Sequence, residues 1–317
     1  METILNVLPL TSEERAVFSA AAPDAEQIFL PNPRLGTAQN ISLDKIARAT
    51  VILGNVMPRT LSTNLRLKWI QTSTAGVDNY LTPGLLPEHT VVTSAAGAYG
   101  PSVAEHMFAC LFSLMKRLPQ YRDQQRAHIW RDLGPVQTLQ GATVLLLGVG
   151  DIGSRFACMV RAFGARTVGL SRHPDRPVDG LDESWSLADL SAWLPRADVV
   201  ANSLPSAPET YHILAADQFA LMKPTAILLN AGRGPTVDGF ALTRALLKEQ
   251  LAGAALDVTD PEPLSPNDPL WDCPDLLLTP HVAGGDHLPT TIQAVVSIAL
   301  DNLRRYVSGQ PLRNQMR

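Results

Sequence analysis

The chain has 317 residues, of which 45% are hydrophobic and 18% charged, and its formal net charge is −4. This composition supports large buried cores and excludes a disordered chain. The slightly acidic balance excludes a general attraction to nucleic-acid phosphates or anionic lipid, so neither is expected as a partner. The length corresponds to about two domains of ordinary size.

The cysteines and the N-terminus indicate the compartment. Cys110, Cys158 and Cys273 lie far apart and form no cluster at the spacing of a zinc site. The N-terminus has no basic segment before an apolar run, and no apolar run approaches the ~20 residues that cross a bilayer. We therefore expect a cytoplasmic protein with reduced thiols, no bound metal and no membrane partner.

The first third of the chain alternates short β-like runs with helical patterns, which is typical of a parallel α/β domain. Helices are predicted at residues 12–21 and 42–49. Strands are predicted at residues 4–8, 27–30, 50–53, 69–71 and 91–93. This alternation predicts a small flavodoxin-like doubly wound domain.

A long helix is predicted to begin near Pro101, because proline fits the first turn of a helix. Its sequence, SVAEHMFACLFSLMKRL, is apolar on most faces, and a polar, arm-like segment follows over residues 119–140. Such a helix and arm would expose apolar surface in a monomer, so we expect a homodimer.

A second α/β series begins near Gly141, and its strands are predicted at residues 143–147, 167–170, 199–202, 226–230, 253–256 and 276–278. The last helix, about residues 289–307, is predicted to pack on the first domain, so that the chain crosses between domains near residues 97–100 and 284–288. The predicted fold class is α/β with two doubly wound parallel-sheet domains and a cleft between them. Residues 1–98 and 286–317 would form the flavodoxin-like substrate domain. Residues 99–285 would form a Rossmann-type cofactor domain that includes the dimerisation helix and arm.

A glycine-rich motif, GVGDIG at residues 148–153, follows the apolar run TVLLL and opens a helical pattern. In such a motif Gly148 makes the tight turn, Gly150 lets a pyrophosphate approach the backbone, and Gly153 allows close helix–strand packing. A helix that begins at Asp151 and Ile152 would present its N-terminus to that negative charge. The motif in this context predicts a dinucleotide site, with a plain glycine turn as the alternative.

The end of the next predicted strand indicates which dinucleotide is bound. Sites specific for NAD place Asp or Glu there to bind the ribose hydroxyls. Here Ser171 stands at that position and Arg172 follows. Serine can hydrogen-bond a 2′-phosphate and arginine can bind it with paired, charge-assisted bonds. We predict NADP(H) as the preferred cofactor, with NAD(H) as the alternative.

Three further segments carry polar residues at or just after the ends of predicted strands, where open parallel sheets bind ligands. Arg233 lies in ILLNAGRGPTVD, Asp257 and Glu262 lie in ALDVTDPEPL, and His281 lies in LLLTPHVAGG. These segments resemble the LNxxRGxxVD, xLDVxxxEP and TPHxxG signatures of the D-isomer-specific 2-hydroxyacid dehydrogenases. The resemblance extends over about residues 50–285: residues 72–78 are similar to the family's substrate loop, 103–106 to its hinge-helix motif and 204–210 to its cofactor loop.

The resemblance implies a role for each matching residue. His281 would be the acid in reduction and the base in oxidation, because histidine titrates near neutral pH. Glu262 would fix its tautomer, and Arg233 would bind the substrate carboxylate and carbonyl oxygen. Main-chain N–H groups would bind the other side of that carboxylate, and they belong to Ala75, Gly76 and Val77.

The resemblance also assigns residues to the cofactor, and these are Val103, Leu204, Pro205, Ala231, Gly232 and Asp257. His106, in the hinge-helix motif, is expected to be a packed helix residue and not a catalytic one. No metal is needed, because the hydride belongs to the cofactor while the protein positions and protonates.

The implied activity is the transfer of a hydride between NADP(H) and a small 2-oxo acid or D-2-hydroxyacid. Residues 72–78 contain no lysine or arginine to bind a phosphate, which favours unphosphorylated acids such as glyoxylate, hydroxypyruvate or a larger 2-oxo acid. The alternative is a dinucleotide-sensing binding protein on the same fold, similar to the family's transcriptional corepressors, because fold alone does not fix function.

Overall fold

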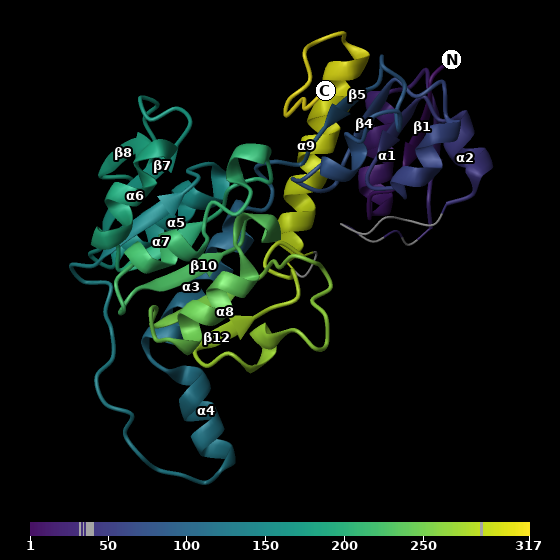
Figure 1. Cartoon of the computed structure of the whole chain (residues 1–317). Helices are drawn as coiled ribbons and strands as arrows, with labels where there is room; N and C mark the ends of the chain where they lie inside the picture. The colour runs from purple at the N-terminus through teal and green to yellow at the C-terminus, as the bar shows by residue number, and fades with distance from the viewer. Residues whose placement is uncertain (32, 34, 36–40, 286–287) are drawn as a thin grey trace. The chain divides into compact units, whose positions relative to one another are not determined.

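The structure is a computed structural model, and it describes residues 1–31, 33, 35, 41–285 and 288–317. The chain divides into two compact units (Figure 1). Unit 1 comprises Met1–Tyr99 and Gly285–Arg317, and unit 2 comprises Gly100–Gly284. The predicted boundaries lie one residue from these divisions. Residues 286–287, which fall within the predicted second crossing, lie outside the described residues.

In the part of unit 1 that the structure describes there are five parallel strands and three α-helices. The strands are β1 (Thr3–Asn6), β2 (Glu26–Phe29), β3 (Val51–Leu53), β4 (Trp69–Gln71) and β5 (Val91–Thr93). The helices are α1 (Ser12–Ala21), α2 (Leu43–Arg48) and α9 (Pro289–Val307). The sheet order is β2-β1-β3-β4-β5, which is the flavodoxin-like order. The predicted fold of this part is therefore confirmed.

Helix α9 joins the distant end of the chain to the sheet of unit 1. The side-chain amide of Asn302 donates a 2.7 Å hydrogen bond to Gln71 Oε1 at the end of β4. The ring of Tyr306 stacks on Trp69 with 5.1 Å between centroids. Both contacts are to β4, so α9 helps to fix the strand from which the loop at residues 72–78 emerges.

Unit 2 contains seven parallel strands and six α-helices in its described part. The strands are β6 (Thr143–Leu147), β7 (Arg166–Ser171), β8 (Glu183–Ser186), β9 (Val199–Asn202), β10 (Ile227–Asn230), β11 (Gly253–Leu256) and β12 (Leu276–Leu278). The helices are α3 (Gly100–Met115), α4 (Leu118–Arg126), α5 (Asp151–Ala162), α6 (Leu190–Trp193), α7 (Ala216–Leu221) and α8 (Gly239–Leu247). The order β12-β11-β10-β9-β6-β7-β8 is the Rossmann order with one added strand, which confirms the predicted cofactor fold.

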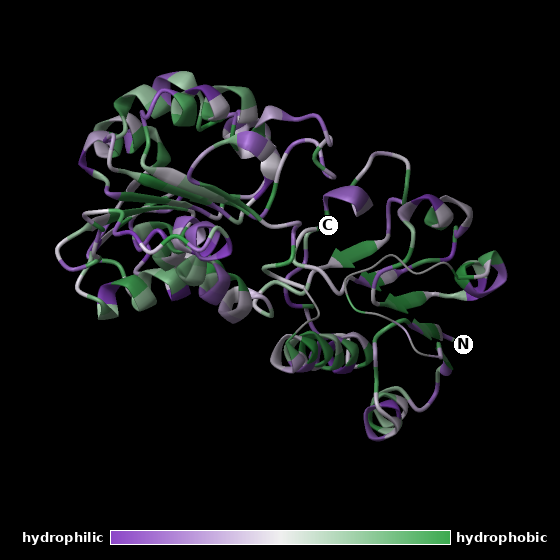
Figure 2. Cartoon of the chain, turned by 90° about the horizontal axis from the view of Figure 1, so that it is seen from below, coloured by the Kyte–Doolittle hydropathy of each residue, from purple (hydrophilic) through white to green (hydrophobic). Residues whose placement is uncertain are grey.

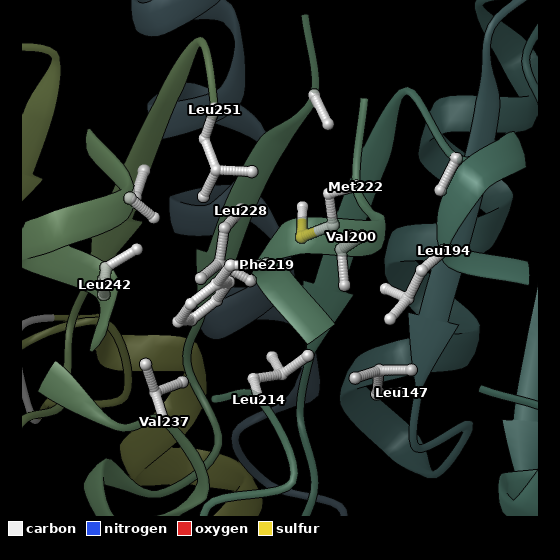
Figure 3. Close-up of a cluster of buried hydrophobic side chains, with 14 of the residues drawn as sticks. Leu147, Leu194, Val200, Leu214, Phe219, Met222, Leu228, Val237, Leu242 and Leu251 are labelled. Carbon is white, nitrogen blue, oxygen red and sulfur yellow. The ribbon is translucent and has the colours of Figure 1, made fainter. Parts of the chain in front are cut away.

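Helices cover both faces of the larger sheet, whose hydrophobic strands lie between two helical layers in Figure 2. Helices α3 and α5 pack together on one face, while α6, α7 and α8 cover the other. On that second face Val200 and Leu228 of the sheet meet Phe219 of α7 and Leu242 of α8 (Figure 3). Burial on both faces explains why these strands are continuous apolar runs.

Two elements of unit 2 differ from the sequence prediction. Strand β8 was not predicted, because its sequence ESWS has no apolar run, and as the edge strand it is only partly buried. The long predicted helix, which was expected to run through Leu118, ends at Met115, and Arg117, with a φ of +53°, separates it from α4. Except for Leu118, helix α4 lies within the segment that was predicted only as a polar arm; it projects from the rest of unit 2 in Figure 1. Among the described residues, no helix is long and apolar enough to cross a membrane.

Candidate active site

The glycine-rich turn joins β6 to α5, and the structure explains the presence of glycine differently at each of its three positions. Gly148 has a φ of +85°, which side chains rarely adopt. A Cβ at Gly153 would lie 2.1 Å from the carbonyl oxygen of Gly148, so only glycine allows this helix to approach the turn. A Cβ at Gly150 would meet nothing within 4 Å, so the backbone there faces open space. The turn therefore fits a pyrophosphate at the N-terminus of α5.

A groove of about 610 Å³ lies beside this turn. Of the predicted cofactor residues, those that line it are Gly148, Gly150, Asp151, Ser171, Arg172, Leu204 and Pro205. Those that do not line it are Val103, Ile152, Gly153, Ala231, Gly232 and Asp257. The groove is thus bounded by the ends of β6, β7 and β9, which is where a Rossmann sheet binds a dinucleotide.

Basic side chains gather at the β7 end of the groove. Ser171 ends β7, and Arg172, His173 and Arg176 follow it along the groove wall, with Asp179 as an acidic neighbour. Arg172, His173 and Arg176 are exposed, and none of them pairs with a carboxylate in the part of the chain that the structure describes. The charges of Arg172 and Arg176 are therefore available to an anion. The sequence reasoning named Arg172 here but missed Arg176.

His281 and Glu262 meet at the carboxyl edge of the same sheet. His281 follows β12 and Glu262 follows β11, and His281 Nδ1 lies 2.8 Å from Glu262 Oε2. The other carboxylate oxygen of Glu262 accepts a 3.1 Å hydrogen bond from Thr259 N–H, which fixes the carboxylate. An ionised carboxylate can only accept, so Nδ1 of His281 carries a hydrogen and donates it. The ring therefore presents Nε2 as the nitrogen available to a ligand.

The turn that carries Arg233 follows β10 and packs against the loop that carries Glu262. A Cβ at Gly234 would lie 1.8 Å from the carbonyl oxygen of Thr259, so only glycine allows this packing. The carbonyl oxygen of Arg233 accepts a 2.6 Å hydrogen bond from the Thr236 hydroxyl. Strands β10, β11 and β12 are neighbours, which brings Arg233, Glu262 and His281 to one edge of the sheet.

Buried amides support this turn, and sequence reasoning missed them. Asn202 Nδ2, at the end of β9, donates to Asn230 Oδ1 at 3.0 Å and to the Thr236 hydroxyl at 2.6 Å. Asn230 Oδ1 in turn accepts from Gly232 N–H at 3.1 Å. All three side chains are at most 2% exposed. Asn202 and Asn230 are the polar last residues of otherwise apolar strands, and this pattern in the sequence could have identified them.

Two predicted cofactor residues have carboxylates that bind the protein itself. Asp257 is 6% exposed; its Oδ1 accepts from the Thr279 hydroxyl at 2.6 Å and from Val282 N–H at 2.9 Å. The carboxylate of Asp151 accepts from Gly100 N–H at 2.9 Å and pairs with Arg155 at 2.8 Å. The Asp257 carboxylate therefore holds the segment after His281, and the Asp151 carboxylate holds the first residue of α3. The contact of either residue with a cofactor stays a prediction.

In unit 1, the loop after β4 presents unpaired main-chain N–H groups. The N–H groups of Ala75, Gly76 and Val77 donate to no protein acceptor among the described residues. The loop is fixed through its other atoms: Ser73 N–H donates to Asn55 Oδ1 at 3.0 Å, and the hydroxyl of Tyr99 donates to the carbonyl oxygen of Ser73. A fixed loop with three free donors suits a carboxylate. Asn55 was not found by sequence reasoning, because no motif includes it.

Comparison with known proteins supports the family resemblance that the sequence motifs indicate. The family model of the D-isomer specific 2-hydroxyacid dehydrogenase, NAD binding domain, matches residues 108–283. The chain belongs to the D-isomer-specific 2-hydroxyacid dehydrogenases. As a member of this family it is an oxidoreductase that uses a nicotinamide dinucleotide.

Relatives of this dehydrogenase match both of its units. A glyoxylate reductase of Aeropyrum pernix is 34% identical over 260 residues, which are 79% of this chain and 76% of that protein. The crystal structure of a family member from Aeromonas salmonicida has a TM-score of 0.86 and 32% identity, and the match covers 100% of this chain and 99% of that one. An NADPH-dependent glyoxylate/hydroxypyruvate reductase of Sinorhizobium meliloti, in complex with NADP and sulfate, has a TM-score of 0.79 and 28% identity, covering 100% of this chain and 98% of that one.

Proposed function

We propose that this dehydrogenase is an NADPH-dependent reductase of small, unphosphorylated 2-oxo acids, which it converts to D-2-hydroxyacids. The observation that carries the proposal is the 2.8 Å pair of His281 and Glu262, at the edge of the sheet that also carries Arg233. The bound dinucleotide supplies the hydride, and the residues of this chain bind, orient and protonate the acid. Relatives named glyoxylate reductase and glyoxylate/hydroxypyruvate reductase favour the same substrate class.

The proton comes from the imidazolium form of His281 in this proposal. Its Nδ1–H donates to Glu262, so its Nε2–H is directed at the substrate and is transferred to the carbonyl oxygen as that oxygen gains charge. Glu262 stabilises the imidazolium and keeps the ring in one orientation. In the oxidation direction, neutral His281 accepts the proton of the hydroxyl group at the same nitrogen.

The acid is oriented by its carboxylate and its carbonyl oxygen. The Arg233 guanidinium can bind both with parallel N–H donors, which also draws electrons from the carbonyl carbon. The free N–H groups of Ala75, Gly76 and Val77 are proposed as further carboxylate donors. No lysine or arginine lies among residues 72–78, which supports an acid without a phosphate group.

A panel of acids and cofactors tests this function. We expect measurable reduction of at least one acid among glyoxylate, hydroxypyruvate, pyruvate, phenylpyruvate and 2-oxoisocaproate, with a D-configured product and a higher kcat/KM for NADPH than for NADH. Steady-state kinetics with both cofactors and chiral chromatography of the product measure these quantities. Failure to reduce any 2-oxo acid, while the protein binds NADPH, would contradict the proposal.

The NADPH preference is expected to depend on Arg172. Its guanidinium is exposed at the groove and has no carboxylate partner among the residues that the structure describes. Replacing it (Arg172→Ala) should raise KM for NADPH about 10- to 100-fold, because hydrogen bonds to charged groups contribute about 1.5–3 kcal/mol. KM for NADH should change little, since NADH lacks the 2′-phosphate.

The matched control is Arg66→Ala, which removes an exposed arginine of unit 1. A complementary variant, Ser171→Asp, should shift preference towards NADH, because the added carboxylate repels a 2′-phosphate and binds ribose hydroxyls. Equal losses with the two cofactors in Arg172→Ala would count against a phosphate contact.

The arm of unit 2 supports a homodimer as the second part of the proposal. Leu118, at the start of α4, and Val136 are about half exposed, and after α4 Ile129 is 47% exposed and Trp130 is fully exposed. Apolar side chains gathered on a projecting segment are typical of a protein interface. Light scattering of the purified chain should give twice its mass of 34.2 kDa, and a mass of one chain at micromolar concentration would contradict a stable dimer.

A further inference from the structure

The N-terminal half of α3 is tied to the segment that carries His281. The hydroxyl of Ser102 donates a 2.5 Å hydrogen bond to the carbonyl oxygen of Ala283. His106 Nε2 lies 3.1 Å from Thr279 Oγ1, although the two residues are 173 positions apart in the sequence. One face of α3 therefore contacts the loop on both sides of His281.

The direction of the hydrogen bond between His106 and Thr279 follows from proton counting. Thr279 has one hydroxyl hydrogen, and it donates this hydrogen to Asp257 Oδ1 at 2.6 Å, because an ionised carboxylate can only accept. Thr279 Oγ1 can then only accept from His106. Nε2 of His106 must therefore carry a hydrogen and donate it, which fixes both the tautomer of His106 and the orientation of the Thr279 hydroxyl.

Asp257 connects this chain of donors to the backbone of His281. Its carboxylate accepts from Val282 N–H at 2.9 Å and from Ala283 N–H at 3.0 Å, directly after His281. Its main-chain oxygen accepts from His281 N–H at 2.8 Å. His281 has a φ of +52°, a conformation that costs free energy for a residue with a side chain and persists only when its surroundings fix it. Asp257 provides that constraint, because its main-chain oxygen binds the N–H group of His281 and its carboxylate binds the two N–H groups that follow.

We propose that His106 is a positioning residue for His281, which acts through the Thr279 hydroxyl and the Asp257 carboxylate. The inference rests on the proposed function, because it assumes that Nε2 of His281 must be held in place for proton transfer. A misplacement of about 1 Å at a reacting group can lower a rate about 100-fold, so a residue remote from the chemistry can have a large effect on kcat.

A neighbouring thiol does not provide an alternative use for His106. Cys110 Sγ lies 3.5 Å from the same Nε2 atom, the geometry of a cysteine–histidine pair. Burial, and then the charge of Asp257, raise the pKa of Cys110 to about 11, so the thiol keeps its proton at neutral pH. Because Nε2 already carries a hydrogen, it cannot accept that proton. His106 therefore serves Thr279 and does not activate Cys110.

A double-mutant cycle tests the inference in the full-length protein. His106→Leu and Thr279→Val should each lower kcat about tenfold, consistent with a small displacement of His281, while the dissociation constant for NADPH changes less than about twofold. His106→Gln, which keeps a donor near the position of Nε2, and Thr279→Ser, which keeps the hydroxyl, should recover most of the activity.

The double variant His106→Leu/Thr279→Val should be no slower than Thr279→Val alone, because both changes interrupt one chain of contacts. His89→Leu, at an exposed histidine of unit 1, is the control and should match the wild type.

The inference would be overturned if the losses in kcat of the two single variants multiplied in the double variant, or if His106→Gln recovered no activity. A loss of NADPH binding that parallels the loss of kcat would also overturn it. An NMR signal of the hydrogen-bonded Nδ1 proton of His281 separates this test from that of the proposed function. It should be present in the wild type and shifted or lost in His106→Leu. A wild-type protein that reduces none of the acids would contradict the proposed function, while this signal would still decide whether His106 positions His281.

Discussion

His281→Ala should lower kcat for the reduction of 2-oxo acids about 1000-fold, within the range of about 10²–10⁴ that a positioned acid contributes. The physical reason is that alanine has no proton donor to replace the imidazole, whose Nδ1 lies 2.8 Å from Glu262 Oε2. Cofactor binding should be unaffected, because His281 does not line the groove beside the glycine-rich turn. Stopped-flow single-turnover rates and fluorescence titration with NADPH measure the two effects separately.

His89→Ala provides the matched control, since His89 is an exposed histidine with no role in the site. Glu262→Gln should give a smaller loss than His281→Ala, because glutamine can still accept from Nδ1–H but does not stabilise the imidazolium. If His281→Ala retained more than about a tenth of the wild-type kcat, the assignment of proton transfer to this residue would be wrong.

The second large effect is expected for Arg233. Arg233→Ala should lower kcat/KM about 1000-fold, because two charge-assisted hydrogen bonds of about 1.5–3 kcal/mol each are lost. Arg233→Lys keeps the charge but lacks the planar pair of donors, so it should recover only part of the loss. Steady-state kinetics at saturating NADPH give both values.

Added guanidinium ion offers a further measurement for this residue. It should restore part of the activity of Arg233→Ala and none of the activity of His281→Ala, because only the first variant lacks a guanidinium. Arg66→Lys, at an exposed arginine of unit 1, is the control for the substitution itself. Equal kcat/KM for Arg233→Lys and the wild type would show that bidentate binding is not used.

Much of the fold could be predicted because parallel strands that are covered on both faces must be apolar. The runs TVLLL and ILLN predicted β6 and β10, and their boundaries agree with the structure within a residue. The last helix was predicted at about residues 289–307, and α9 spans Pro289–Val307 with proline at its first turn. The edge strand β8 could not be found in this way, because only one of its sides pairs in the described sheet and its residues are half exposed.

The sequence pattern predicted that Arg233, Glu262 and His281 each lie at or after the end of a strand, and the sheet order of the structure makes those strands, β10, β11 and β12, neighbours. Hydrogen bonds between distant segments were decided only by the tertiary structure. His106 donates to Thr279, 173 residues away, and the carboxylate of Asp257 binds the backbone after His281. The reason is that the position of each strand in the chain follows from local apolar periodicity. The order of the strands in the sheet and the partner of a polar side chain depend on which surfaces the packed helices and loops bring within about 3 Å.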